Sequence, residues 1–328
     1  MNRINQLFNS NKKDILSIYF CAGDPTLDGT ANVIRTLEKH GVSMIEVGIP
    51  FSDPMADGIV IQNAATQALR NGMSLKILFE QLRNIRQDVN IPLVFMGYLN
   101  PIMQFGFENF CHQCVECGID GVIIPDLPFR DYQDHYRIIA ERYGIKVIML
   151  ITPETSEERV REIDAHTDGF IYMVSSAATT GAQQDFNEQK RAYFKKIEDM
   201  NLRNPLMVGF GISNKATFQA ACEHASGAII GSRFVTLLEE EKDPEKANAV
   251  LSSLEQAYVN HIEELYQSDV YKEKAMQYML ERFQHVWSFS NMPFSVFDEK
   301  EILVQGELIS TFLMACYLEE QGVKVVLL

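Results

Sequence analysis

The stretch MIEVGIPFSDPMADG, residues 44–58, shows the pattern that decides the fold. An apolar run comes first, and a loop rich in Pro, Gly, Ser and Asp follows at once, which is typical of a buried strand with a polar end. The same arrangement recurs through the first three quarters of the chain, in ILSIYFCAGDP, PLVFMGYLNP, GVIIPDLPF, KVIMLITPE, FIYMVSS, PLMVGFGIS and GAIIGS. Together these runs predict eight strands.

The segments between the strands have helical periodicity, as in residues 31–40 and 75–86. Near-continuous apolar strands that alternate with amphipathic helices favour an α/β fold with a parallel sheet covered on its outer face. Eight such units, from near Ser17 to near Ile230, predict a (β/α)8 TIM barrel. An open doubly wound sheet is the alternative, but here polar residues follow every strand instead of gathering at one switch point.

Length and charge limit the possible partners. The chain has 328 residues, which is too long for a lone barrel of about 250. Its formal net charge of -15 argues against nucleic acid and anionic membranes as partners, because both are polyanions. We expect no signal peptide and no membrane span, since no apolar run approaches the roughly 18 residues that a bilayer requires. We therefore expect a cytoplasmic protein with reduced cysteines.

Two carboxylates belong to the stretch quoted first. Glu46 lies inside the apolar strand, where a side chain that points into the barrel would have a raised pKa and could act as a general acid and base. A carboxylate salt-bridged inside the barrel is the alternative. Asp57 lies in the following loop and can face the barrel mouth, although an N-cap or turn Asp is the simpler interpretation.

Small residues after the last three strands predict a second part of the site. GFGIS, residues 209–213, ends the seventh strand, and Gly231-Ser232 ends the eighth strand just before a helix. In TIM barrels these two loops commonly bind phosphate through backbone N–H groups, although such glycines can also serve only as turns. The loop at residues 175–184, SSAATTGAQQ, is of the type that closes over a substrate, or it is a plain solvent loop.

Three cysteines form a C-x2-C-x2-C pattern, Cys111, Cys114 and Cys117, which is also found at iron–sulfur and zinc sites. Residues 107–117 are predicted to be a helix, so the sulfurs would lie along one stripe, and the other cysteines lack ligand spacing. We therefore interpret these cysteines as structural and expect no metal.

The motifs together resemble the tryptophan synthase alpha chain family over roughly residues 1–246. EVGIPFSDPMADGIVIQNA at 46–64 is the most specific of them, and the others follow in family order: GDP at 23–25, GYLNP at 97–101, PDLP at 125–128, TTG at 179–181, GFGIS at 209–213 and GS at 231–232. The resemblance implies a TIM-barrel lyase of aromatic amino-acid biosynthesis. Such an enzyme cleaves indole-3-glycerol phosphate into indole and glyceraldehyde 3-phosphate by a retro-aldol reaction.

The resemblance also implies roles for individual residues. Glu46 matches the acid/base carboxylate and Asp57 the second catalytic carboxylate. The implied substrate-binding residues are Tyr19, Tyr98, Tyr172, Thr180, Gly181, Gly211, Gly231 and Ser232. Two positions depart from the family: Ala178 stands where glycine is usual, and Tyr19 stands where phenylalanine is frequent.

The family assembles as an alpha2beta2 heterotetramer, so the resemblance implies a beta chain as partner. Asp53, Pro54 and Pro128 match the surface that faces it. We expect no cofactor in this chain, because pyridoxal phosphate (PLP) belongs to the beta chain.

The tail departs from the family from about residue 248. It resembles an internal fragment of aspartate kinase, most clearly at QGELIST, residues 305–311, where the resemblance implies that Glu307 binds substrate. The nucleotide-binding motif KFGGT is absent, so we expect no kinase activity. The predicted organisation is a barrel domain at 1–266, with its last helix replaced by residues 250–265, and a mostly helical, non-catalytic fragment at 267–328 that ends in a strand, KVVLL. The alternative functions are an assembly-impaired fusion with little activity and another phosphate-binding barrel enzyme of the same pathway.

Overall fold

The computed structural model describes residues 2–10, 14–175, 188–212, 214–240, 259–289 and 296–322. The chain divides into two compact units, Met1–Thr236 and Leu237–Leu328, which are considered one at a time. No helix in the described part of the chain is both long enough and apolar enough to cross a membrane.

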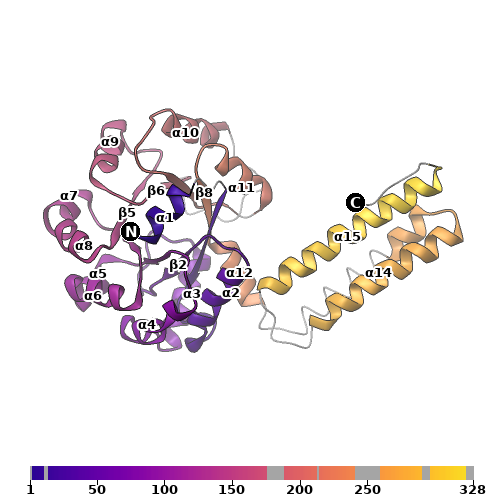
Figure 1. Cartoon of the computed structure of the whole chain (residues 1–328), viewed down its shortest axis with the longest axis horizontal. Coiled ribbons are helices and arrows are strands. Elements are labelled where there is room, and N and C mark those ends of the chain that lie inside the picture. Colours follow the sequence, from indigo (N-terminus) through magenta and orange to yellow (C-terminus); the bar gives the residue numbers. More distant parts are fainter. Residues whose placement is uncertain are drawn as a thin grey trace. The chain divides into compact units, whose positions relative to one another are not determined.

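The first unit is a closed barrel of parallel strands in which each strand pairs with the next and β8 pairs with β1 (Figure 1). The predicted TIM barrel is therefore confirmed. The strands are β1 Ile15–Cys21, β2 Met44–Gly48, β3 Leu93–Met96, β4 Gly121–Ile123, β5 Lys146–Ile151, β6 Ile171–Val174, β7 Leu206–Gly209 and β8 Gly227–Ile230. Nearly all of their residues are buried, as expected of strands covered on both faces.

Helices surround the barrel in the alternating order that the sequence predicts (Figure 1). They are α1 Arg3–Asn9, α2 Thr30–Lys39, α3 Ile59–Arg70, α4 Leu75–Leu82, α5 Leu99–Phe105, α6 Phe107–Cys117, α7 Phe129–Asp131, α8 Arg137–Tyr143, α9 Glu157–His166, α10 Glu188–Glu198, α11 Lys215–Cys222 and α12 Ser232–Glu240. Side-chain caps fix several helix starts, such as Ser74 on α4 and Ser156 on α9. Helix α6 has the predicted bounds, and its three cysteine side chains are buried.

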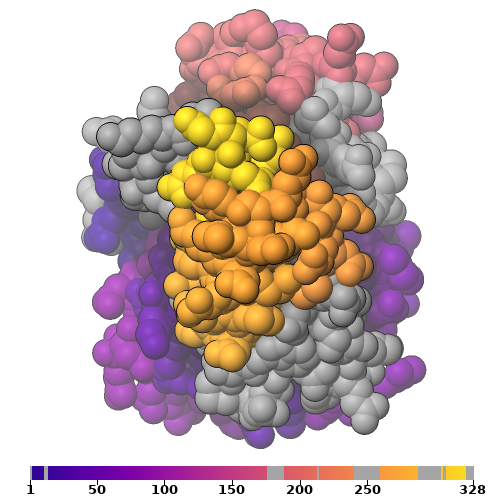
Figure 2. Space-filling view, turned by 90° about the vertical axis from the view of Figure 1, so that its right-hand side faces the viewer, coloured from indigo at the N-terminus to yellow at the C-terminus, as the bar shows by residue number. Residues whose placement is uncertain are grey.

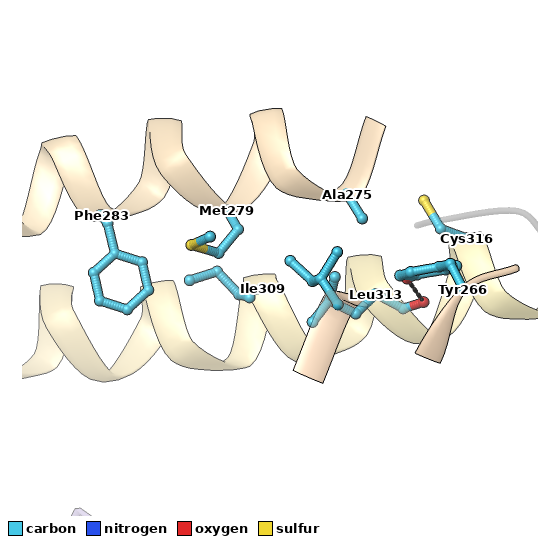
Figure 3. Close-up of a cluster of buried hydrophobic side chains, with 8 residues drawn as sticks. Tyr266, Ala275, Met279, Phe283, Ile309, Leu313 and Cys316 are labelled. Atoms are coloured by element: carbon cyan, nitrogen blue, oxygen red, sulfur yellow. Dashed lines mark hydrogen bonds between the residues drawn. The ribbon is translucent and has the colours of Figure 1, made fainter. Parts of the chain in front are cut away.

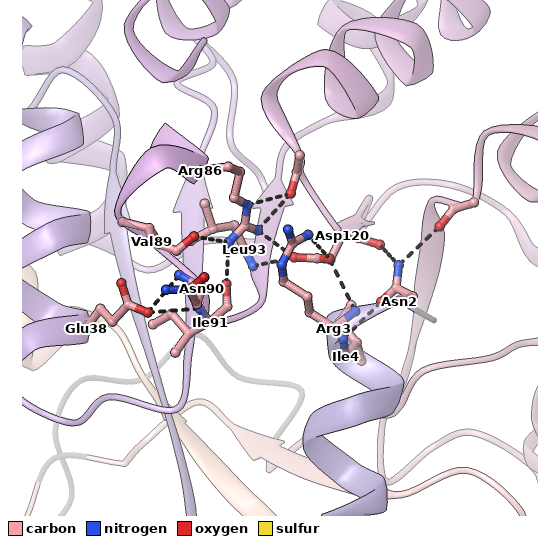
Figure 4. Close-up of polar contacts among 12 residues, drawn as sticks. Asn2, Arg3, Ile4, Glu38, Arg86, Val89, Asn90, Ile91, Leu93 and Asp120 are labelled. Atoms are coloured by element: carbon pink, nitrogen blue, oxygen red, sulfur yellow. Dashed lines mark hydrogen bonds and ion pairs between the residues drawn. The ribbon is translucent and has the colours of Figure 1, made fainter. Parts of the chain in front are cut away.

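A charged network lies at the amino-terminal ends of β3 and β4 (Figure 4). The buried carboxylate of Asp120 accepts hydrogen bonds from Arg86 Nη2 at 2.6 Å, Arg3 Nη1 at 3.2 Å and the Leu93 backbone N–H at 3.0 Å. Burial lowers the pKa of Arg86 to about 10, and Asp120 opposes that shift. The network ties α1 to the barrel at the end where residues generally serve stability.

The second unit has its own hydrophobic core. It contains helical residues 259–265 and two long helices, α14 Asp269–Phe289 and α15 Val296–Glu320. The buried side chains of the core are Ile262, Tyr266, Ala275, Met279, Phe283, Ile309, Leu313 and Cys316 (Figure 3). The Tyr266 hydroxyl donates to the Leu313 carbonyl at 2.6 Å. In Figure 2, the orange residues that include α14 lie directly against the yellow residues of α15.

These observations confirm the expected helical extension, with one correction. We expected residues 250–265 to form the eighth barrel helix. The described part of that segment instead packs into the core of the second unit through Ile262, because its apolar side chains match those of α14 and α15. The helix that follows β8 is α12. The predicted strand KVVLL lies outside the described residues, and so does the side chain of Glu307.

Candidate active site

Glu46 lies in the middle of β2, paired with Tyr19 of β1 and Val94 of β3. Its side chain is completely buried. One carboxylate oxygen, Oε1, accepts a hydrogen bond from Ser17 Oγ at 3.2 Å, and the other, Oε2, has no partner among the described residues. Burial raises the pKa of Glu46 to about 8, although the hydrogen bond from Ser17 opposes the shift. Glu46 is therefore protonated at neutral pH.

Asp57 lies in the loop after β2 and is 7% exposed. The Tyr98 hydroxyl donates to Asp57 Oδ2 at 2.9 Å and accepts from the Ala56 backbone N–H at 2.9 Å. Burial raises the pKa of Asp57 to about 6, and the bond from Tyr98 opposes the shift. At neutral pH Asp57 is ionised while Glu46 keeps its proton.

Tyr19 and Tyr172 bring two further hydroxyl groups to the same interior. Burial raises the pKa of Tyr172 well above its usual value, and the negative charges of Glu46 and Asp57 add to that effect. The pKa of Tyr19 is raised mainly by burial as well, with smaller contributions from neighbouring acidic groups that include both carboxylates. Strands β1, β2 and β6 and the loop with Asp57 therefore bring these four side chains to one interior.

Glycines make room for these tyrosines. A Cβ atom at Gly48 would overlap the Tyr19 hydroxyl, and one at Gly209 would overlap the Tyr172 hydroxyl. Gly48 was not among the predicted site residues, and Gly209 was predicted only as part of the phosphate-binding motif GFGIS, not as a residue that makes room for a tyrosine. The sequence signal that could have identified them is a glycine at the end of one strand when the neighbouring strand carries a tyrosine that points into the barrel.

The predicted phosphate-binding glycines follow β7 and β8. Gly211 has a φ of +78°, a conformation that L side chains rarely adopt. Gly231 lies so close to Tyr19 that a Cβ there would be in ordinary contact with that side chain, at 3.5 Å. Ser232 begins α12, whose first-turn N–H groups are free of helical partners. The structure thus brings Gly231 next to the tyrosine beside the carboxylates. Thr180, Gly181 and Ala178 lie outside the described residues.

The predicted partner-facing residues lie in loops after β2 and β4. Asp53 and Pro128 are exposed and Pro54 is half-buried. The Asp126 carboxylate accepts from the Leu99 backbone N–H at 2.8 Å, which ties the loop after β4 to the loop that carries Tyr98.

Comparisons with known proteins identify the family. A model of the tryptophan synthase alpha chain family matches residues 5–265, so the match continues past residue 248, from about which we expected the tail to depart from the family. The tryptophan synthase alpha chain of Bacteroides thetaiotaomicron is 98% identical over 247 residues, which are 75% of this chain and 96% of that protein. The alpha chain of Bacteroides fragilis is 83% identical over 254 residues, 77% of this chain and 97% of that one.

Solved structures show the same similarity. The tryptophan synthase alpha subunit of Legionella pneumophila is 36% identical with a TM-score of 0.65, covering 72% of this chain and 88% of that one. A chain of the tryptophan synthase complex of Pyrococcus furiosus is 34% identical with a TM-score of 0.64. The match covers 70% of this chain and 92% of that one.

Proposed function

The chain belongs to the tryptophan synthase alpha chain family, and we propose that Glu46 and Asp57 are the residues that carry out its reaction. It is a lyase of tryptophan biosynthesis that cleaves indole-3-glycerol phosphate into indole and glyceraldehyde 3-phosphate. These products form by a retro-aldol step, in which the bond between indole C3 and the side-chain carbon that bears a hydroxyl breaks.

Glu46 would act first as an acid and then as a base. Protonated at neutral pH, it gives its proton to indole C3, and the ring becomes a positively charged indolenine. The resulting carboxylate takes the proton of the side-chain hydroxyl. The O–H electrons then form the aldehyde C=O, and the electrons of the broken C–C bond restore the neutral indole ring. Glu46 regains its proton, so the cycle needs no outside acid or base.

Asp57 would stabilise the charge that develops between these two transfers. Its carboxylate is ionised at neutral pH and can accept a hydrogen bond from the indole N–H as the ring becomes positive. Tyr98 holds Asp57 Oδ2 at 2.9 Å. The observation that carries the proposal is the pair of buried carboxylates with different surroundings. Glu46 is completely buried with no partner on Oε2 among the described residues, which favours its protonated form, whereas Asp57 Oδ2 accepts from Tyr98, which favours its charged form.

Variants of the two carboxylates test this assignment. We expect Glu46→Gln and Asp57→Asn each to lower the rate of indole release at least about 100-fold. Glu80→Gln, an exposed acid of α4, is the control and keeps the normal rate. Near-normal turnover by Glu46→Gln would show that the acid/base assignment is wrong.

The remaining substrate contacts are also proposals. Tyr19 and Tyr172 would flank the indole ring, Thr180 would pack on Asp57 when its loop closes, and Gly181, Gly211, Gly231 and Ser232 would bind the phosphate. Backbone N–H groups at a helix start are suited to a phosphate dianion even in a chain of net charge -15. Removing the phosphate from the substrate should therefore raise KM at least about tenfold.

Membership of the family implies a beta chain as partner. We propose an alpha2beta2 heterotetramer in which Asp53, Pro54 and Pro128 face the beta chain. This chain would use no cofactor of its own, since two carboxylates suffice for the proton transfers, and pyridoxal phosphate would belong to the beta chain. We further propose a cytoplasmic location, which the six free thiols support.

We assign catalysis to residues 1–266 and no catalytic role to residues 267–328. The separate core of the second unit supports the lack of a catalytic role for residues 267–328, and Ile262 and Tyr266 belong to the same core. Indole release by the full chain and by a version that ends after Gln267, each with and without the beta chain, tests it. If only the shorter version responds to the beta chain, the tail impairs assembly.

A further inference from the structure

Ser17 is a buried polar residue in the barrel interior. It lies on β1 between Met44 of β2 and Ile229 of β8 in the strand register, and it is completely buried. A buried hydroxyl without a hydrogen bond is destabilising, so the partner of this hydroxyl matters. The partner that the structure gives it is Glu46 Oε1, at 3.2 Å.

The hydrogen bond makes the two oxygens of Glu46 different. Oε1 receives the Ser17 hydroxyl, whereas Oε2 is buried without a partner among the described residues. When Glu46 is protonated, the oxygen that already accepts a hydrogen bond is the better carbonyl oxygen, and the proton belongs on the other oxygen. We propose that Ser17 is a positioning residue that holds Oε1 of Glu46 and leaves Oε2 to deliver and take back the proton in the reaction.

This inference rests on the proposed role of Glu46. The Ser17 hydroxyl donates to Glu46, so its proposed effect on the reaction passes through that carboxylate. It would fix the carboxylate plane, and it would stabilise the ionised form that exists between the two proton transfers. It would also keep the affinity of Glu46 for its proton from rising so far that the proton is no longer given up.

Other acidic groups face Glu46 and bear on its titration. They are Tyr19 from β1 and Tyr172 from β6, with Asp57 and its partner Tyr98 close to both tyrosines. Burial raises the pKa of each tyrosine further, so these side chains stay neutral through the working range. The pKa of Asp57, about 6, lies below that of Glu46. The alkaline side of the rate profile therefore reports Glu46.

The test compares pH profiles of kcat and kcat/KM for indole release by the full chain and its variants. For Ser17→Ala we expect the alkaline limb to move up by about one pH unit, because a hydrogen bond to a charged group is worth on the order of one pKa unit. We expect kcat to fall about tenfold and KM to stay within about twofold. Ser17→Thr keeps the hydroxyl and should restore the limb.

Controls separate this role from simple packing. Ser43→Ala removes another buried serine, just before β2, and should leave the profile unchanged. Thermal unfolding of each variant shows whether it is folded. If the larger side chain of Ser17→Thr overpacks the barrel, the alkaline limb of Ser17→Ala alone tests the role of Ser17. An alkaline limb that does not move in folded Ser17→Ala would overturn the inference, whatever happens to KM. Full activity of Glu46→Gln would instead overturn the role of Glu46 itself.

Discussion

The buried carboxyl of Glu46 should make the stability of the barrel depend on pH, and Glu46→Gln should remove that dependence. Burial raises the pKa from 4.5 in the unfolded chain to about 8 in the folded protein. Between these values the folded protein holds a proton that the unfolded chain has released. Stability therefore falls as pH rises, and this contribution is fully present only below the unfolded value.

The pKa shift sets the size of the effect. Each pKa unit corresponds to about 1.4 kcal/mol. Between about pH 5 and about pH 8, the Glu46 carboxyl alone should lower the free energy of unfolding by about 3 kcal/mol. The side-chain amide in Glu46→Gln leaves an N–H group where Oε2 has no partner, which costs about 1–3 kcal/mol. That cost does not vary with pH. The informative quantity is therefore how the difference in unfolding free energy between Glu46→Gln and the wild type changes with pH.

The assay is urea unfolding of the wild type and Glu46→Gln at several pH values, followed by circular dichroism. Trp287 is the only tryptophan and lies outside the barrel strands, so its fluorescence would report the second unit. Asp57, whose pKa is about 6, contributes to both proteins and cancels in the difference. We expect Glu46→Gln to gain about 3 kcal/mol relative to the wild type over this range. A difference that stays constant with pH would refute the argument that this carboxyl is desolvated.

Three further predictions concern other parts of the chain. Tyr98→Phe removes the hydroxyl that opposes the raised pKa of Asp57, so the acid limb of kcat/KM for indole release should move up by about one pH unit. Asp120→Asn removes the negative charge beside the half-buried guanidinium of Arg86, which keeps its bonds to backbone carbonyls, so urea unfolding should show a loss of about 1.5–3 kcal/mol with kcat unchanged. Met279→Ala should destabilise the second unit by about 2–5 kcal/mol, seen as an earlier change in Trp287 fluorescence during unfolding, without slowing indole release. An equal loss of stability in the barrel would contradict the assignment of Met279 to the core of the second unit.

The barrel could be predicted from the sequence because its strands are buried on both faces. Burial of this kind produces short, nearly continuous apolar runs, and a polar loop follows each of them. Glu46 was recognisable because a carboxylate in such a run is unusual. The role of Asp57 was harder to predict, because its place near Glu46 depends on the conformation of the loop after β2. The sequence alone allowed Asp57 to be a simple turn residue.

Ser17 could not be identified from the sequence, because its contact with Glu46 spans two strands. A serine in an apolar strand can point inward or outward, and only the register that pairs Tyr19 with Glu46 brings Ser17 within 3.2 Å of the carboxylate. The same limit applies to residues 259–265. Their periodicity predicts an amphipathic helix but does not say which apolar surface it covers, and the surface of α14 and α15 was equally suitable.

The two ends of the barrel use buried carboxylates in opposite ways. Asp120 accepts from two guanidinium groups and two backbone N–H groups, so its charge is matched and it serves to hold elements together. Glu46 accepts only the Ser17 hydroxyl among the described residues. A second donor on Oε2 would stabilise the anion and take away the proton that the reaction needs, whereas no donor at all would leave the carboxylate unoriented and too basic. A single hydrogen bond meets both requirements, which is why one serine hydroxyl suits this position better than an arginine.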